Sequence, residues 1–413
     1  MTYSEMKDSG VEWIGDIPKG WKVYALSQLA TKVNRKNFDL REQNLLSLSY
    51  GKIKRKDIRN NEGLLPASFD GYNIIESGDI VLRLTDLQND HTSLRVGRAT
   101  ERGMITSAYV TIRPYNPHLS EMLYYALHSY DIKKGFYGMG SGVRQGLNYD
   151  EVKTIKVVIP DVGTVSSIVS YLNARCAEID TIIGEAKASI DDYKRWKASV
   201  IYQAVTKGLD PDAPMKDSGI SWIGKFPAHW SAGRVKNVTF NLDELRQPVS
   251  AENRENTLGL YDYYGASGVI DKIDDYNVSD TVLLIGEDGA NLRMRNLPLV
   301  YRASGKFWVN NHAHILKVKP NHSYGFMAYL LEAGDYNIYI TGAAQPKLTQ
   351  FNLMRFPIVI PPHNEQVEIE AYLDAQCSTI DAIISEKQSL IAELEAYKKS
   401  LIYEAVTGKR KVG

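Results

Sequence analysis

A long segment that occurs twice constrains this chain more than any other feature. The first copy begins at Val157 and the second at Ile358. They align without a gap, so that Cys176 and Cys377 are equivalent positions 201 residues apart. In both copies apolar residues recur at spacings of mostly three and four, which predicts an amphipathic helix. These residues are Ile168, Leu172, Cys176, Ile179, Ile183, Ala186, Ile190, Tyr193, Val200 and Ala204 in the first copy, and Ile369, Leu373, Cys377, Ile380, Ile384, Ile391, Leu394, Leu401 and Ala405 in the second.

An apolar seam of this heptad type is buried only when another helix packs against it. One interpretation is that the two helices are unrelated and that each lies on a domain of its own. The matched length and register of the copies favour the other interpretation, in which the two helices pair with each other. We therefore expect the two cysteines to be small core residues rather than a disulfide.

A second repeat precedes each variable region. MKDSGVEWIGDIPKGW begins at Met6 and MKDSGISWIGKFPAHW begins at Met215. Paired tryptophans around a glycine and a proline predict an ordered loop or strand pair held by aromatic packing, with a peptide-binding patch as the alternative. The chain is therefore a tandem duplication. We divide it into a first domain at residues 1–160, a long helix at 161–208, a second domain at 209–361 and a second long helix at 362–413.

Composition excludes several classes of protein. The chain is 44% hydrophobic and 24% charged, as in soluble globular proteins, and it has no apolar run of about 18 residues that could span a membrane. Its start, MTYSEMKDSGVEW, lacks the basic and apolar regions of a signal peptide, so we expect a cytoplasmic protein. The net charge of zero argues against a chain coated with basic residues, but a local basic face for nucleic acid remains compatible with it.

The first domain is predicted to contain short strands, such as Asn44 to Tyr50, and one short helix from Ser120 to Ser129. Its stretch from Lys52 to Arg59 alternates basic and apolar residues, which suits either a solvated sheet edge or a DNA-contacting strand. A second basic group follows at Arg95, Arg98 and Arg102, and a glycine-rich loop carries Arg144 and Gln145. That loop lacks the Lys-Ser/Thr and the strand–turn–helix context of a phosphate loop.

The second domain has its own markers, which are the segments YDYYGASGVIDKI, LLIGEDGA, FWVNNHAHIL and GAAQPKL. Within the apolar segment from Phe307 to Leu316, His312 and His314 raise the question of a metal. No further ligands follow at useful spacing, so polar residues satisfied within a sheet are the favoured interpretation and no metal site is expected.

Motifs for catalysis are missing from the sequence. There is no [DNS]PPY or FxGxG motif of an adenine methyltransferase with its S-adenosylmethionine site, and no GxxxxGK[ST] of an ATP-driven motor. No Ser/His/Asp or Cys/His spacing and no metal nuclease cluster stands out. We therefore expect a chain that is not an enzyme, that needs no cofactor, and that leaves the chemistry to its partners.

These segments resemble the specificity subunit of type I restriction–modification systems. The resemblance rests on the long helices after IP and IPP, the WIG–P–W leaders, YYGASGVID, LLIGEDGA, FWVNNHAHIL and GAAQPKL, and it covers essentially the whole chain. It implies an α+β fold with two target-recognition domains of mixed sheet and short helices. Two long helices would join them as an antiparallel coiled coil, with an internal pseudo-two-fold repeat. It also implies that each domain reads one half of a bipartite, asymmetric site on double-stranded DNA, and that two methyltransferase subunits and restriction subunits join the complex.

Candidate DNA contacts follow from general recognition chemistry. Lys and Arg bind phosphates, whereas Arg on guanine and Asn or Gln on adenine read bases. The candidates are Lys52, Lys54, Arg55, Lys56, Arg59, Arg95, Arg98, Arg144 and Gln145 in the first domain, and Arg293, Arg295, Arg302, Asn310, Asn311, Gln345 and Lys347 in the second.

Two other functions remain open at this point. One is a coiled-coil interaction scaffold whose domains bind proteins or glycans, for which zero net charge is slightly better suited. The other is a specificity subunit that serves a combined methyltransferase–nuclease polypeptide instead of separate subunits.

Overall fold

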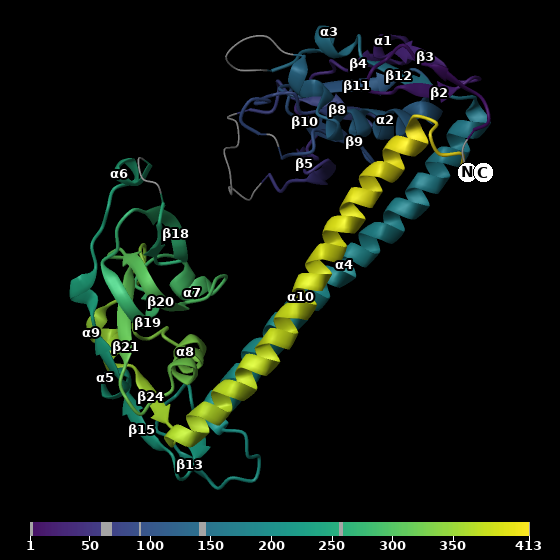
Figure 1. Ribbon diagram of the computed structural model, residues 1–413. Coiled ribbons are helices and arrows are strands. Elements are labelled where there is room, and N and C mark those ends of the chain that lie inside the picture. The colour runs from purple at the N-terminus through teal and green to yellow at the C-terminus, as the bar shows by residue number, and fades with distance from the viewer. Residues whose placement is uncertain (1–2, 59–67, 91, 140–145, 256–258, 413) are drawn as a thin grey trace. The chain divides into compact units, whose positions relative to one another are not determined.

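The computed structural model describes residues 3–58, 68–90, 92–139, 146–255 and 259–412. The chain divides into two compact units, of which unit 1 comprises Met1–Ala186 and Gln388–Gly413, and unit 2 comprises Lys187–Lys387. Each unit combines one domain with a segment of each of two long helices, α4 (Val162–Lys207) and α10 (His363–Val406), which are labelled in Figure 1.

Unit 1 is built from short elements before α4. They are β1 (Met6–Asp8), β2 (Asp16–Pro18), β3 (Lys22–Ala25), α1 (Leu26–Leu29), β4 (Ala30–Lys32), β5 (Leu46–Ser49), β6 (Lys52–Arg55), β7 (Asn73–Ile75), β8 (Ile80–Leu82), β9 (Val96–Arg98), β10 (Gly103–Ile105), β11 (Val110–Pro114), η1 (Pro117–Leu119), α2 (Ser120–Ile132), η2 (Gly135–Gly138), α3 (Tyr149–Val152) and β12 (Lys156–Ile159).

Unit 2 repeats this order with longer strands. Its elements before α10 are β13 (Met215–Asp217), β14 (Lys225–Pro227), β15 (Ser231–Arg234), α5 (Val235–Val238), β16 (Thr239–Asn241), η3 (Asp243–Leu245), α6 (Ala251–Glu255), β17 (Tyr261–Gly265), β18 (Gly268–Ile273), β19 (Val278–Gly286), α7 (Asn291–Met294), β20 (Val300–Val309), β21 (Ala313–Val318), α8 (Tyr324–Ala333), β22 (Ile340–Thr341), β23 (Lys347–Leu348), α9 (Gln350–Arg355) and β24 (Pro357–Ile360).

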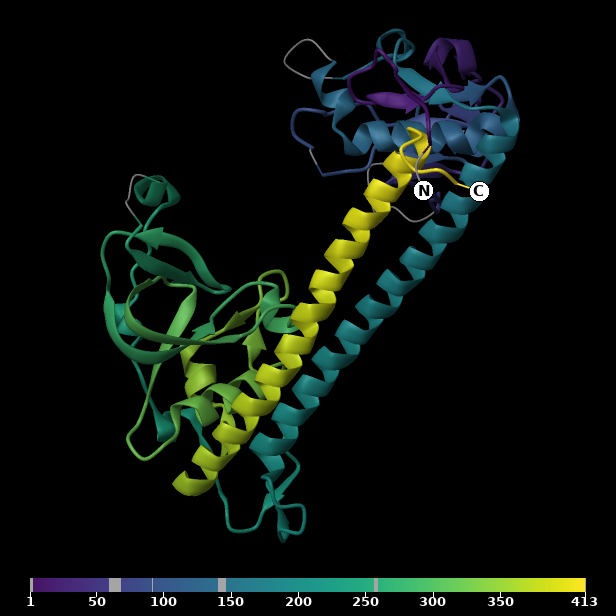
Figure 2. The same cartoon turned by 45° about the vertical axis from the view of Figure 1, so that its right-hand side comes forward.

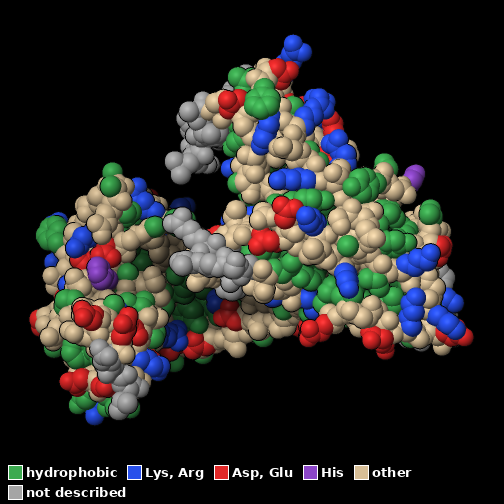
Figure 3. Space-filling view, turned by 90° about the horizontal axis from the view of Figure 1, so that it is seen from above, with side chains coloured by type: hydrophobic (Ala, Val, Ile, Leu, Met, Phe, Trp, Pro, Cys, Tyr) green, Lys and Arg blue, Asp and Glu red, His purple; other side chains and the backbone are tan. Residues whose placement is uncertain are grey.

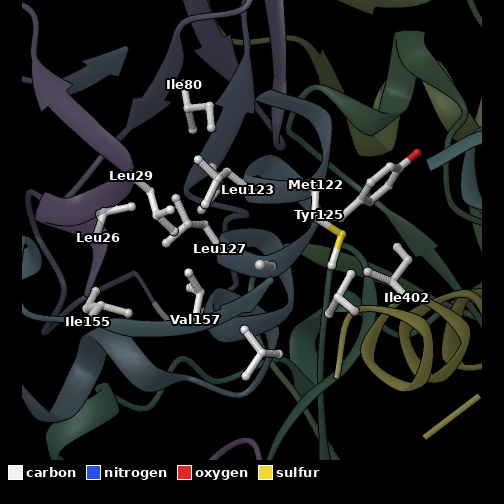
Figure 4. Close-up of a cluster of buried hydrophobic side chains, with 14 of the residues drawn as sticks. Leu26, Leu29, Ile80, Met122, Leu123, Tyr125, Leu127, Ile155, Val157 and Ile402 are labelled. Carbon is white, nitrogen blue, oxygen red and sulfur yellow. The ribbon is translucent and has the colours of Figure 1, made fainter. Parts of the chain in front are cut away.

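A four-stranded antiparallel sheet in the order β4-β11-β8-β9 organises unit 1. All three residues of β8 are buried, because this strand is covered on both faces. Helix α2 contributes Leu123 and Leu127 to the main core, where Figure 4 shows them among side chains of the sheet and of α1. Ile402 of α10 belongs to the same core, so the end of the second helix is part of this unit.

The sheet of unit 2 has six strands in the order β16-β21-β19-β20-β17-β18. Its first four strands repeat the order of the sheet in unit 1, and β17 adds to β20 in parallel, carrying the hairpin partner β18 with it. The topology therefore confirms the mixed α+β class and the internal repeat that the duplicated sequence predicts. The extra hairpin contains the YDYYGASGVIDKI segment.

The long helices run antiparallel within each unit, and Figure 2 shows them side by side. In unit 1, Asp180 of α4 accepts from Lys398 of α10 at 2.6 Å, and in unit 2 Lys197 of α4 pairs with Asp381 of α10 at 2.6 Å. The repeat relates these two ion pairs, because Asp381 and Lys398 each lie 201 residues after Asp180 and Lys197. Most of the predicted apolar seam residues are buried, and both cysteines are buried and free.

The two leaders form the predicted strand pairs. β1 pairs with β2 in unit 1 and β13 with β14 in unit 2, both antiparallel. The indole N–H of Trp13 donates to the carbonyl of Lys156 at 3.2 Å, and that of Trp222 donates to the carbonyl of Pro357 at 3.1 Å. Each leader thus closes on the strand that precedes its unit's long helix. No helix in the described ranges is long and apolar enough to cross a membrane.

One local expectation needs correction. The segment from Phe307 to Leu316 was expected to be a single apolar stretch, but it is two strands, since β20 ends at Val309 and β21 begins at Ala313. The polar residues between them form a turn, in which the side chain of Asn310 accepts from the backbone N–H of His312 at 2.8 Å. An Asn that bonds the backbone two residues on stabilises a turn rather than a strand.

Candidate nucleic-acid interface

Segments of unit 2 that are far apart in the sequence meet beyond the end of β19. We call them the loop cluster, which comprises the loop after β19 (residues 286–290), the turn between β20 and β21 (310–312) and the segment into β23 (342–348). The backbone N–H of Glu287 donates to the carbonyl of His312 at 2.8 Å, and that of Leu348 donates to the carbonyl of Glu287 at 2.7 Å. The three segments therefore hold one another through backbone hydrogen bonds.

The YYGASG turn lies against the same cluster. The backbone N–H of Asn310 donates to the carbonyl of Tyr264 at 3.0 Å. At Gly286 an added Cβ would lie 2.6 Å from the carbonyl oxygen of Ala266, so only glycine permits this close approach. Four of the segments that the sequence singled out are thus brought to one place.

A network of buried charges supports the loop cluster. The Nδ1 atom of His314 lies 2.6 Å from Oδ2 of Asp243, and its Nε2 lies 2.7 Å from the carbonyl oxygen of Leu348. Both ring nitrogens face acceptors, an arrangement that suits a protonated ring. Arg246 continues the network, with Nη2 3.4 Å from Oδ2 of Asp243 and Nη1 bonded to Glu287.

Lys347 completes this network at the surface. Its Nζ lies 2.9 Å from Oε1 of Glu287, and its side chain is half exposed. Burial alone would raise the pKa of Glu287, but its hydrogen bonds with Lys347 and Arg246 bring that pKa below its ordinary value. Burial would likewise raise the pKa of Asp243, and the hydrogen bond and charge of His314 bring it below its ordinary value. Both carboxylates are therefore ionised at neutral pH and hold the cations of the cluster.

The two histidines have separate partners. His314 is fully buried between Asp243 and Leu348, whereas the exposed His312 lies 2.8 Å from Asp288 through its Nδ1 atom. The interpretation of the histidines as polar residues satisfied within the sheet region therefore holds for both. In the parts of the chain that the structure describes, no group of three or more His, Cys, Asp or Glu residues could hold a metal ion.

The seven candidate DNA contacts of unit 2 fall into three environments. Arg293, Asn311 and Gln345 are exposed, the last two within the loop cluster, and Lys347 is held there by Glu287. Asn310 is buried in the turn. Arg295 adopts a left-handed conformation with φ 51° and donates to the carbonyl of Glu332, and Arg302 pairs with Asp374 at 3.3 Å.

Unit 1 places its candidates differently. Lys52, Lys54 and Lys56 are exposed along and just after strand β6, while Arg55 of that strand is held by Glu101, with Nε 2.9 Å from both carboxylate oxygens. Arg98 is mostly buried, with Nη1 3.3 Å from Oε1 of Glu121. Arg59, Arg144 and Gln145 lie outside the described residues.

Arg95 is the one candidate that the structure moves to the interior. Its exposed fraction is 0%, and its guanidinium donates to the carbonyls of Arg83 at 3.1 Å and Thr85 at 2.8 Å. Its Nε donates to the hydroxyl of Tyr137 at 2.9 Å, and its backbone N–H donates to Oδ2 of Asp131 at 2.6 Å. As placed, Arg95 is not available to a ligand. It fixes the loop after β8 instead.

The loop after β8 in unit 1 is the counterpart of the loop after β19 in unit 2. The carbonyl of Leu84 accepts from the N–H of Leu147 at 2.9 Å, just as that of Glu287 accepts from Leu348. In each unit a mostly buried arginine braces this loop, Arg95 in unit 1 and Arg246 in unit 2. Sequence reasoning missed Arg246 and Asp243, because their only signal is the short LDELR stretch after β16.

Charge is mixed over the molecular surface. On the face shown in Figure 3, Lys and Arg side chains lie interspersed with Asp and Glu. Many of the described cations have an acidic partner, as Lys347 and Arg55 do. Selective contacts at the ends of the central strands therefore suit a nucleic acid better than a uniformly basic face would.

Comparison with known families gives one match. A family profile described as "Type I restriction modification DNA specificity domain" matches residues 235–396, which include the loop cluster. Among curated proteins, a putative type I restriction enzyme specificity subunit of Haemophilus influenzae is 34% identical over 141 residues, which cover 34% of this chain and 35% of that protein. The EcoprrI specificity subunit of Escherichia coli is 28% identical over 131 residues, 31% of each chain. The matched regions thus span about a third of these relatives.

The fold extends over much more of the chain than these sequence matches. A solved chain from a study titled for the complex assembly and conformational transition of the type I R-M system is similar, with a TM-score of 0.68 and 15% identity. The match covers 94% of this chain and 98% of that chain. The two proteins therefore share a fold over nearly their whole lengths.

Proposed function

We propose that this chain, which belongs to the family of type I restriction–modification specificity subunits, supplies DNA recognition to a complex whose other subunits carry out the chemistry. Each unit would read one half of a bipartite, asymmetric site on double-stranded DNA. Two methyltransferase subunits would methylate adenine there, and restriction subunits would cleave DNA that lacks the mark. The chain itself would be non-catalytic and would act in the cytoplasm.

The observation that carries this proposal is the loop cluster of unit 2. Asn311 and Gln345 present amide groups that suit the hydrogen-bonding edge of adenine, and Lys347 adds a cation beside them. The backbone bonds among the three segments and the charges beneath them keep these groups rigid, which a selective reader requires. The cluster also lies within the residues that match the specificity domain.

Phosphate binding in unit 1 is proposed for β6 and the residue after it. Lys52, Lys54 and Lys56 are exposed and follow one another at alternate positions, so their side chains can follow a phosphate backbone. Such contacts give affinity without sequence information and weaken as salt rises. We assign no base-reading residue to unit 1.

Two substitutions in the loop cluster separate base reading from phosphate binding. Gln345→Ala should relax the preference for one base pair of a half-site and cost about 1 to 3 kcal/mol of discrimination. Lys347→Ala should weaken binding nearly equally for all sequences and reduce the slope of log K against log salt by about 1. Fluorescence anisotropy with labelled duplexes at several salt concentrations measures both effects.

The duplexes for this experiment come from mapping methylated adenines in cells with and without the gene. A bipartite motif that disappears with the gene defines the site and both half-sites. If methylation is unchanged without the gene, or if the purified chain with its partners binds all duplexes alike, the proposed function is wrong. Purification of the associated subunits shows whether methyltransferase and nuclease are separate chains or one polypeptide.

A further inference from the structure

A tyrosine of unit 2 connects the recognition domain to the long helix α10. The hydroxyl of Tyr329 on α8 donates to Oδ1 of Asp374 on α10 at 2.7 Å. Arg302 of β20 reaches the same carboxylate oxygen at 3.3 Å and lies over the Tyr329 ring, 4.6 Å from its centroid. Sheet, short helix and long helix therefore meet at a single carboxylate.

The first turn of α8 touches the same face of α10. Ser323 donates through its backbone N–H to Oε1 of Gln366 at 2.9 Å and through its hydroxyl to Glu370. Together with Asp374, these α10 residues are spaced by four, so they form one polar stripe on the helix. At Gly325 an added Cβ would lie 2.1 Å from Oε1 of Glu370, which shows how closely α8 approaches.

Unit 1 has an equivalent contact with different chemistry. The hydroxyl of Tyr125 on α2 donates to Oδ1 of Asn173 on α4 at 2.7 Å, and Asn173 donates to Glu121 at 3.2 Å. In Figure 4 the Tyr125 hydroxyl points away from the labelled aliphatic side chains. Asn173 is the repeat counterpart of Asp374, 201 residues earlier, and Arg98 pairs with Glu121 instead of with the long helix.

We propose that these tyrosines are latches that fix the position of each recognition domain on its long helix, and that Arg302 and Arg98 serve the latches rather than DNA. The latch of unit 2, formed by Tyr329, Asp374 and Arg302, is an ionic one, whereas Tyr125 and Asn173 form a neutral latch in unit 1. The purpose of the latches rests on the proposed function, because a reader of two half-sites needs each domain held in a defined orientation.

Each latch covers a cysteine, which provides a built-in reporter. Cys377 lies one turn after Asp374 and is 5% exposed, and Cys176 lies one turn after Asn173 and is 7% exposed. Burial raises the pKa of both thiols, and each also has a hydrogen bond with its latch tyrosine. Both thiols therefore react slowly while the latches are closed, and opening one latch exposes only its own thiol.

The test is alkylation of the intact chain with iodoacetamide, followed by mass spectrometry of the two cysteine peptides. Tyr329→Phe should accelerate alkylation of Cys377 about tenfold, since a hydrogen bond to a charged acceptor is lost, and should leave Cys176 unchanged. Tyr125→Phe is the matched control and should accelerate only Cys176. In the wild-type chain, raising salt to about 1 M should accelerate Cys377 and not Cys176, and Asp374→Asn should abolish this salt effect.

Equal alkylation of both cysteines in every variant, or acceleration of both by either substitution, would overturn the proposal. Both tyrosine changes keep the ring and its packing, so circular dichroism serves to confirm that the variants remain folded. This measurement contains no DNA, so a failed latch is distinguishable from a failed recognition function, which the methylation map tests. With partners present, Tyr329→Phe should weaken binding to the mapped site while leaving the preferred bases of both half-sites unchanged.

Discussion

Replacing Arg95 with methionine is expected to lower the free energy of unfolding of unit 1 by about 3 to 5 kcal/mol. The guanidinium is fully buried and donates to the carbonyls of Arg83, Thr85 and Asp86, the last at 3.3 Å, and also to the hydroxyl of Tyr137. Methionine fills similar space but satisfies none of these acceptors. Native-state hydrogen exchange of peptides from β8 and α2, in the intact chain, measures the loss.

The matched control for this experiment is Arg83→Met. Arg83 is partly exposed, and its guanidinium lies 3.8 Å from Asp90, a weak surface pair worth about 0 to 1 kcal/mol. Its backbone carbonyl, which Arg95 uses, remains in the variant. If Arg95→Met leaves stability unchanged and removes only DNA binding, the structural role assigned to Arg95 is wrong and the sequence-based expectation of a DNA contact is restored.

Arg95 also shows what the sequence could not reveal. The basic group of Arg95, Arg98 and Arg102 looks uniform in the sequence, yet the first is buried and braces a loop. Whether an arginine faces solvent depends on where distant carbonyls lie, and those positions follow from the path of the loop after β8. Periodicity within one segment contains no information about that path.

Features encoded by local pattern were predicted well. The long helices were expected near residues 163–206 and 363–407, and they are Val162–Lys207 and His363–Val406, because apolar spacing of three and four is a property of a single segment. The leaders were likewise identified by their repeat. In contrast, the convergence of GEDGA, NNHAH and QPKL arises from pairing of β19 with β21 and from contacts to β23, which one sequence does not specify.

The loop cluster illustrates the same limit for candidate site residues. Asn310 and Asn311 are adjacent and chemically identical, but the first is buried within the turn and the second is exposed. Lys347 was identified as a cation, whereas its carboxylate partner Glu287 lies 60 residues earlier in the chain. Buried counter-charges of this kind become visible only with the tertiary structure.

Acidification is expected to destabilise unit 1 through His128 of α2. Burial, and then the nearby charges of Lys398 and Lys399, lowers the pKa of His128 from 6.5 to about 4. The unfolded chain therefore binds a proton at this residue over a pH range in which the folded chain does not. The stabilising contribution is complete above pH 6.5 and is lost as pH falls to 4, which amounts to about 3 kcal/mol.

His128→Phe isolates this contribution, because the ring of His128 stacks on Tyr124 with centroids 5.7 Å apart, and phenylalanine preserves that packing without a titratable group. The free energy of unfolding of the wild-type chain, minus that of His128→Phe, should fall by about 3 kcal/mol between pH 7 and pH 4. Urea-dependent hydrogen exchange of α2 peptides, corrected for intrinsic exchange rates at each pH, provides the measurement.

Asp131 on the same helix supplies a control with the opposite sign. Burial raises its pKa from 3.8 to about 6, so the folded chain binds a proton there before the unfolded chain does, and acidification favours folding at this residue. The wild-type free energy of unfolding minus that of Asp131→Asn should therefore rise as pH falls from 6 towards 4, and the two contributions partly cancel in the wild-type chain. A difference for His128→Phe that does not change with pH would show that the imidazole is not desolvated as its place between α2 and α10 requires.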